Sequence, residues 1–131
     1  MDFLNPLAIG LATLSAFLLG GVWYGPLFGS AWRLASGQSA EVLAARNLPR
    51  VFALAGLLAL LAAVNLAAFL GPEAELAFGT AAGFAAGAGW VGTLLGIIYL
   101  FEARPLSLWL INAGYATVAL TLMGAILGGV R

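Results

Sequence analysis

The chain has 131 residues, of which 63% are apolar and 8% charged, and its five arginines balance five acidic residues. A soluble domain has about a quarter charged residues, so this composition excludes an ordinary soluble fold, and the neutral balance leaves no basic face for nucleic acid. Cysteine and histidine are absent, which argues against disulfide frameworks, thiolate or imidazole metal sites and histidine acid–base chemistry. We therefore expect no metal and no cofactor.

Four apolar stretches follow one another along the chain, at about residues 4–24, 51–70, 76–101 and 106–130. Each has the roughly 20 apolar residues that a helix needs to cross a bilayer. The stretches are continuously apolar, whereas barrel strands alternate in polarity. The first lacks the basic start of a signal peptide, so we expect it to be retained. The sequence thus predicts an all-α, polytopic membrane protein: one domain over residues 1–131, built as a bundle of four transmembrane helices in the lipid bilayer.

The connection over residues 26–50 is the longest, and its run 40–46 favours a short interfacial helix with Ser39 as the N-cap. This connection and the one near Arg104 share a side of the membrane and together carry four of the five arginines. The other side has Asp2, Glu73, Glu75 and Arg131. Because short cytoplasmic loops are rich in arginine, we predict that the 26–50 loop is cytoplasmic and that both termini lie outside.

Glycines recur along the third stretch at four-residue intervals, first at Gly79, Gly83 and Gly87 and then at Gly92 and Gly96. Such spacing leaves a stripe without side chains, along which another helix can approach closely. We favour packing within the chain over a dimer face, and neither interpretation implies chemistry.

Aromatic and polar residues gather at two places where a structural and a functional role compete. Trp23, Tyr24, Phe28 and Trp32, with Pro26 among them, fit an interfacial anchor better than a ligand pocket. Trp109, Asn112 and Tyr115 share one face of the fourth helix and are the best candidates for an internal polar site, although helix packing is the default use. Glu102 and Arg104 fit a surface ion pair, since neither lies near the bilayer midplane.

Two sequence strings together resemble a known family. They are Gly21-Val-Trp23-Tyr24-Gly-Pro26-Leu-Phe28-Gly29-Ser-Ala-Trp32 and Tyr99-Leu-Phe101-Glu102-Ala-Arg104-Pro-Leu-Ser-Leu-Trp109-Leu-Ile-Asn112-Ala-Gly114-Tyr115. The chain resembles the bacterial domain of unknown function 1761 family over nearly its whole length. The resemblance implies a small four-helix protein of the bacterial inner membrane, without an established activity. Where that family often has a histidine after the tyrosine, this chain has Ala116.

If the two strings lie on the same side of the membrane, they should converge, and Trp32 or Trp109 should contact the region of Glu102. We find no nucleophile with a base, no carboxylate pair within a span and no phosphate-binding loop, so an enzyme is not expected. The first hypothesis is a bundle that acts by self-assembly or as a small subunit or stabiliser of a membrane complex. The second is a small oligomeric transporter or channel for a neutral or weakly polar solute, with Glu102, Arg104, Asn112 and Tyr115 along its path.

Overall fold

The computed structural model describes residues 5–130, and every regular element in that range is a helix. In chain order the elements are α1 (Pro6–Val22), η1 (Trp23–Leu27), α2 (Gly29–Ser36), α3 (Ala40–Ala44), α4 (Leu48–Leu70), α5 (Leu76–Ala86), η2 (Gly87–Gly92), α6 (Thr93–Phe101) and α7 (Leu106–Gly129). The two η elements are π-helical turns: η1 continues α1, and η2 joins α5 to α6.

Within residues 5–130, four continuous helices are long and apolar enough to cross a membrane: Pro6–Leu27, Leu48–Leu70, Leu76–Phe101 and Leu106–Gly129. Their ends lie within three residues of the predicted stretches. The all-α, four-helix membrane fold expected from the sequence is therefore present.

Side chains before two of these helices explain where they begin. The Asn5 side-chain oxygen accepts hydrogen bonds from the backbone N–H groups of Leu7 and Ala8, at 3.0 and 3.3 Å. The Asn47 side chain likewise accepts from Arg50 N–H at 3.2 Å. The first N–H groups of a helix have no acceptor within the helix, and the side-chain oxygens of these cap residues accept their hydrogen bonds. In the loop, Ser39 caps α3 by accepting from Val42 N–H at 3.1 Å, as predicted.

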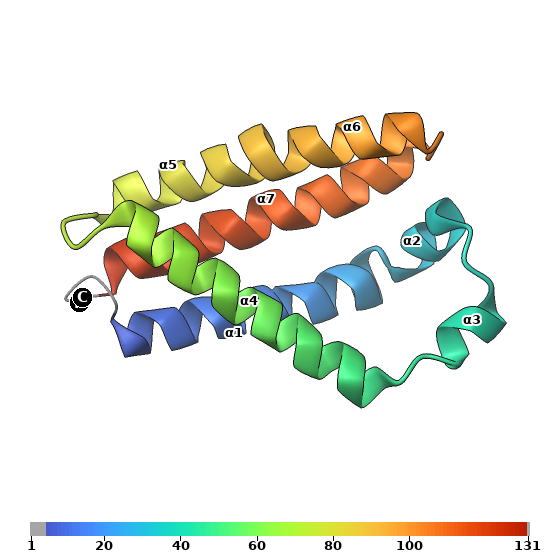
Figure 1. Ribbon diagram of the computed structural model, residues 1–131, viewed down its shortest axis with the longest axis horizontal. Coiled ribbons are helices and arrows are strands. Elements are labelled where there is room, and N and C mark those ends of the chain that lie inside the picture. The colour runs from blue at the N-terminus through green and yellow to red at the C-terminus, as the bar shows by residue number, and fades with distance from the viewer. Residues whose placement is uncertain (1–4, 131) are drawn as a thin grey trace.

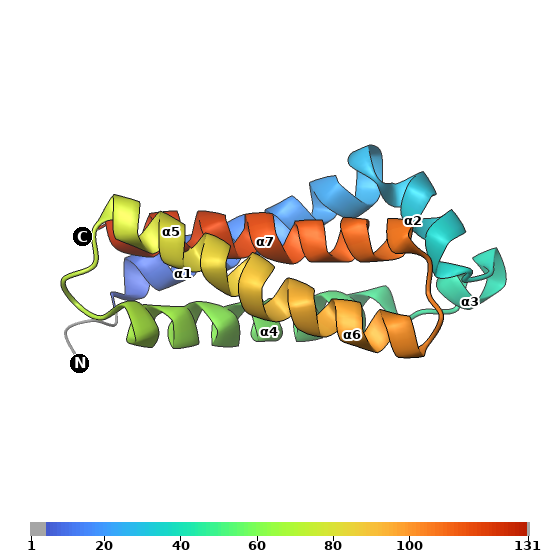
Figure 2. The same cartoon turned by 90° about the horizontal axis from the view of Figure 1, so that it is seen from above.

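The central helix is α7, which packs against α5 and η2 on one side and against α1 on another, while α4 packs chiefly against α1 (Figure 1). The main core is formed by small and aliphatic residues of α1, α4 and α7, among them Ala12, Ala63, Leu66, Ala119 and Met123. Figure 2 shows α5 running alongside α7 and α6 leaning away from it.

The bundle has two chemically different ends (Figure 1). One holds α2, α3 and the turn 102–105, with Arg33, Arg46, Arg50 and Arg104; we name it the arginine end. The other holds the loop 71–75 with Glu73 and Glu75, and we name it the glutamate end. Asp2 and Arg131, which entered the orientation argument, lie outside the described residues.

The segment Gly29–Ser36 is helical, although the sequence indicated only a connection there. Its alanines and leucine favour a helix, and the Trp32 N–H donates to Phe28 O at 2.7 Å. Gly37, in the left-handed conformation with φ of 69°, ends this helix. The 26–50 connection thus contains two short helices, α2 and α3.

Candidate functional site

The first family-like string lies on the π-helical turn at the end of α1. Pro26 has no N–H to donate to the preceding turn, and its ring would clash with that turn in an α-helix. The chain widens here instead: Phe28 N–H donates to Trp23 O, five residues back, at 2.8 Å. π-Helical turns are rare and are enriched at functional sites. This turn directs Trp23 and Tyr24 toward α7, where both make hydrogen bonds.

Asn112 joins three helices through its amide. The Tyr24 hydroxyl donates to Asn112 Oδ1 at 2.6 Å, and Asn112 Nδ2 donates to the Tyr99 hydroxyl at 2.8 Å. Since Tyr24 lies on η1 and Tyr99 on α6, this chain of hydrogen bonds crosses the arginine half of the bundle. All three side chains are half-buried.

Two more hydrogen bonds tie α1 and η1 to α7. Trp23 Nε1 donates to Ile111 O at 2.9 Å, and the Tyr115 hydroxyl donates to Ala16 O at 2.9 Å. The Trp23 ring lies against Gly114, where a Cβ atom would come within 2.9 Å of it. A glycine is needed at position 114 because the indole occupies the space that a larger residue would fill.

Aromatic rings connect these groups to the remainder of the first string. The Tyr24 ring lies 5.5 Å from the Tyr115 ring and 6.1 Å from the Trp32 ring, the latter edge to face. The Trp23 and Phe28 rings lie 4.8 Å apart. Aromatic pairs at these separations are attractive, so the ring contacts form two groups at the arginine end, Tyr24 with Trp32 and Tyr115, and Trp23 with Phe28.

The second π-helical turn, η2, meets the remaining tryptophan of the site. Trp109 Nε1 donates to Gly92 O at 2.8 Å, and the indole covers Gly96. Gly79, Gly83 and Gly87 lie against the backbone of α7. The predicted glycine stripe therefore faces α7 of the same chain along its whole length.

Glu102 and Arg104 form an exposed ion pair, with Arg104 Nε 3.2 Å from Glu102 Oε1 and side chains 51% and 41% exposed. Between them, Ala103 has a left-handed φ of 56°. Arg104 N–H donates to Tyr99 O and Ala103 N–H to Leu100 O, the pattern that commonly closes a helix around a glycine. Arg104 Nη1 also donates to Ser36 O on α2, at 3.1 Å.

The two strings converge at the arginine end, as we expected. The contact near Glu102 has a different form from the one predicted: Arg104 binds the end of α2 four residues after Trp32, while Trp109 reaches Gly92. Two hydrogen-bonding groups of this site were not predicted from the sequence. Tyr99 lies within the second string but had not been selected, and the Ser36 carbonyl, like any backbone acceptor, has no signature in the side-chain pattern.

Apart from Glu102 and Arg104, the side chains of this cluster contact other helices through neutral hydrogen bonds. Within residues 5–130, no buried side-chain nitrogen or oxygen lacks a partner, and no group of metal-binding side chains occurs. Phenol, indole and amide groups are used to join helices to one another. The arrangement is therefore suited to holding the arginine half of the bundle together.

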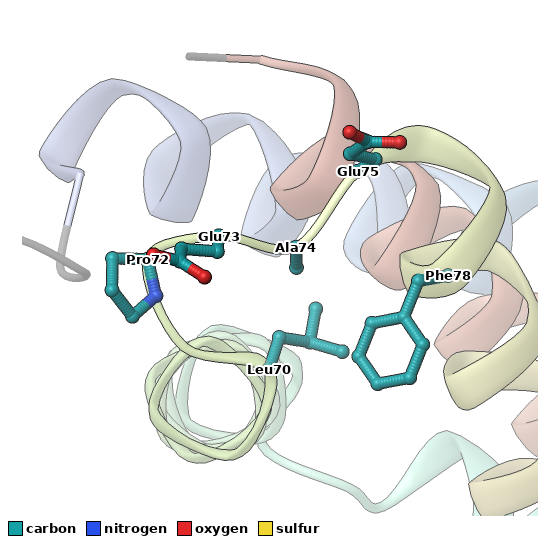
Figure 3. Close-up of a pocket in the computed structure, with 6 residues that line it drawn as sticks. All are labelled: Leu70, Pro72, Glu73, Ala74, Glu75 and Phe78. Carbon is teal, nitrogen blue, oxygen red and sulfur yellow. The ribbon is translucent and has the colours of Figure 1, made fainter.

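An open cleft of about 440 Å³ lies at the opposite, glutamate end (Figure 3). It lies between the end of α4 and the start of α5 and is lined by Leu70, Pro72, Glu73, Ala74, Glu75 and Phe78. The Leu70 and Phe78 side chains point toward one another there (Figure 3). None of the predicted cluster residues lines this cleft.

Four apolar spans joined by such contacts define a multi-pass helical membrane protein. The chain belongs to the family described as Protein of unknown function (DUF1761), whose model matches residues 7–128. The family resemblance noted in the two strings is thereby confirmed. No curated protein and no solved structure matches the chain.

Proposed function

We propose that this protein is a non-enzymatic assembly module of the bacterial inner membrane, which acts by binding a second copy of itself or another membrane protein. In this proposal the lipid bilayer is its solvent, and the partner is a transmembrane helix. No cofactor and no nucleic acid take part.

The observation that carries the proposal is that polar side chains of the candidate site make hydrogen bonds to neighbouring helices of the same chain. Asn112 bonds to Tyr24 and Tyr99, Tyr115 to Ala16 O and Trp109 to Gly92 O, so these groups bind neighbouring helices of the chain. A transport path would instead need some of them turned toward a water-filled cavity. Their use as internal ties favours a packing role over the alternative, a small oligomeric transporter or channel.

The outer surface of the bundle supports the same proposal. From Leu48 to Leu61, α4 has no buried residue, because this half of the helix diverges from α5 and α6 toward the arginine end (Figure 1). In membranes, helices associate through shape, small residues and interhelical hydrogen bonds. A helix with so much free surface is available to a partner.

Arginine placement supports a cytoplasmic arginine end. Arg33, Arg46, Arg50 and Arg104 all lie there, in short connections or at a helix start, and such loops stay in the cytoplasm. In this orientation both ends of the chain face outward. A membrane-impermeant thiol reagent should therefore label a Glu73→Cys variant in intact cells and spare Glu41→Cys, whereas the reverse pattern would overturn the orientation.

Intact-complex mass spectrometry after purification from native membranes in mild detergent tests the proposed function. A homo-oligomer, or a stoichiometric complex with another membrane protein, is the expected result. A monomer at membrane concentrations would overturn the proposal. Solute flux in liposomes, abolished by Asn112→Leu in a variant that still folds, would favour the transporter instead.

A further inference from the structure

One face of α4 forms a regular seam that no other part of the described chain covers. Six exposed residues make up the α4 seam: Val51, Leu54, Leu58, Leu61, Asn65 and Ala68. Each residue turns a helix by about 100°, so the seam lies opposite Ala63 and Ala67, which are 0% and 3% exposed and face the core. Leu58, near the middle of the seam, is 65% exposed.

Asn65 is a polar residue on this otherwise apolar seam. Its Nδ2 donates to Leu61 O, one turn back on the same helix, at 2.8 Å. Within residues 5–130, its side-chain oxygen and second amide hydrogen have no partner. Exposed Thr93 differs, because its single hydroxyl hydrogen is already donated to carbonyls of its own helix. In hydrocarbon no water can satisfy the amide, so the free acceptor and donor of Asn65 require another chain.

Asn65 lies inside the membrane span, fifteen residues after Arg50 and five before Leu70, the last residue of α4. These separations are about 22 Å and about 8 Å along the helix axis, which places the amide within the hydrocarbon core and nearer to the glutamate end. Side chains on a helix also lean toward its N-terminus, which directs the amide further from the nearer glutamate end.

The seam has the spacing of a coiled coil. Its members are separated by three, four, three, four and three residues, the repeat that keeps a straight face toward a parallel partner helix with left-handed supercoiling. A lone asparagine on such a seam specifies the register and the number of helices. On this seam Leu61 precedes Asn65 and Ala68 follows it.

We propose that the α4 seam binds the α4 seam of a second copy of this chain, with the two Asn65 amides hydrogen-bonded to one another. The concentration of arginines at one end gives every copy the same orientation in this proposal, so two α4 helices that meet side by side are parallel and their Asn65 residues lie at the same depth. An amide offers both a donor and an acceptor, so it pairs with its own copy about a two-fold axis normal to the membrane. This inference rests on the proposed assembly function and names its partner.

Disulfide mapping in native membranes tests the seam, and the absence of cysteine from the chain makes every engineered cysteine unique. Leu54→Cys and Leu58→Cys should each form a crosslinked dimer on oxidation. Leu60→Cys is the matched control, because this residue is also exposed, at 40%, but lies off the seam on the same helix. Equal crosslinking at all three positions, or none on the seam, would overturn the proposal.

Asn65 is tested by its own variants in a dimerisation assay at controlled protein-to-lipid ratio. Asn65→Leu should raise the dissociation constant about tenfold, as the loss of an interhelical amide pair implies, while Asn65→Gln should retain most of the affinity. An unchanged dissociation constant for Asn65→Leu would show that the Asn65 amide is not part of the dimer interface. If mass spectrometry finds a homo-oligomer and the chain crosslinks only through Leu94→Cys on α6, the proposed assembly function is supported and the α4 seam is not the interface. A monomer would overturn both proposals.

Discussion

The two ends of the bundle are held together by different interactions. At the glutamate end, Gly79 and Gly83 of α5 bring their backbone against Gly124 and Leu120 of α7, with no side chain between the helices. At the arginine end, Trp109, Asn112 and other polar side chains connect helices that are further apart. Close backbone contact cannot be adjusted when a group is added, whereas a hydrogen bond between side chains can be lost at modest cost. Substitutions at the glutamate end should therefore lower the free energy of unfolding more than substitutions at the arginine end.

The largest effect should come from Gly83→Ala. A Cβ atom there would collide with the backbone of Leu120 and Thr121, so α5 and α7 must separate. We expect a loss of about 3 kcal/mol or more in the free energy of unfolding, at the upper end of what overpacking costs. Unfolding in mixed micelles measures it. Gly89→Ala is the control, because nothing lies within 4 Å of a Cβ at that position; equal losses in both variants would refute close packing as the cause.

Insertion of one alanine after Gly89 should affect the arginine half selectively. The π-helical turn η2 already absorbs one extra residue, so a second would turn α6 by about 100° relative to α5, and Gly92 and Gly96 would leave the face toward α7. We expect a loss of about 2 kcal/mol, from the Trp109–Gly92 and Asn112–Tyr99 hydrogen bonds, each near 0.6 kcal/mol, and from packing.

A second substitution shows whether this rotation is the cause. Tyr99→Phe should cost stability in the unchanged chain and nothing further in the insertion variant, because the hydrogen bond to Asn112 is already absent there. Additive effects of the insertion and Tyr99→Phe would contradict the role assigned to η2. Gly89→Ala, which keeps the chain length, serves again as the control.

The η2 turn also shows what sequence reasoning could and could not reach. The stripe Gly79, Gly83, Gly87, Gly92 and Gly96 was identified from its four-residue intervals, and the five-residue step from Gly87 to Gly92 was passed over. That step is the signal of the π-helical turn Gly87–Gly92, because the wider turn absorbs the one extra residue and so keeps all five glycines on the same face. The four spans followed from hydropathy alone, since the bilayer fixes their length and polarity.

The contacts at the arginine end were harder to predict than the spans. The two strings named Trp23, Tyr24, Trp109 and Asn112, but which atoms would meet depends on helix rotation, which hydropathy leaves open. Tyr99 became a partner of Asn112 only because η2 turns α6 to face α7. Acceptors such as Ile111 O and Ala16 O belong to the backbone and are available at any residue.

Asn112→Leu should have an intermediate effect. It removes two hydrogen bonds between helices, so we expect a loss of about 1.2 kcal/mol, with Tyr24→Phe and Tyr99→Phe each costing about half as much. Thermal unfolding in detergent and a double-mutant cycle between Tyr24→Phe and Asn112→Leu measure these terms. Strict additivity in that cycle would mean that the 2.6 Å contact contributes no coupling energy.

The smallest effect should come from the exposed turn, and there two substitutions separate two contacts. Glu102→Gln removes only the ion pair, which should cost less than about 0.5 kcal/mol because both side chains are solvated. Arg104→Gln removes the ion pair and also the bond to Ser36 O, so it should cost more, by about 0.5 kcal/mol. Unfolding at low and high salt measures both: salt should weaken the ion pair and leave the Ser36 contribution in place. Equal costs would mean that Arg104 does not hold α2 to the bundle, and that the first string is fixed by η1 alone.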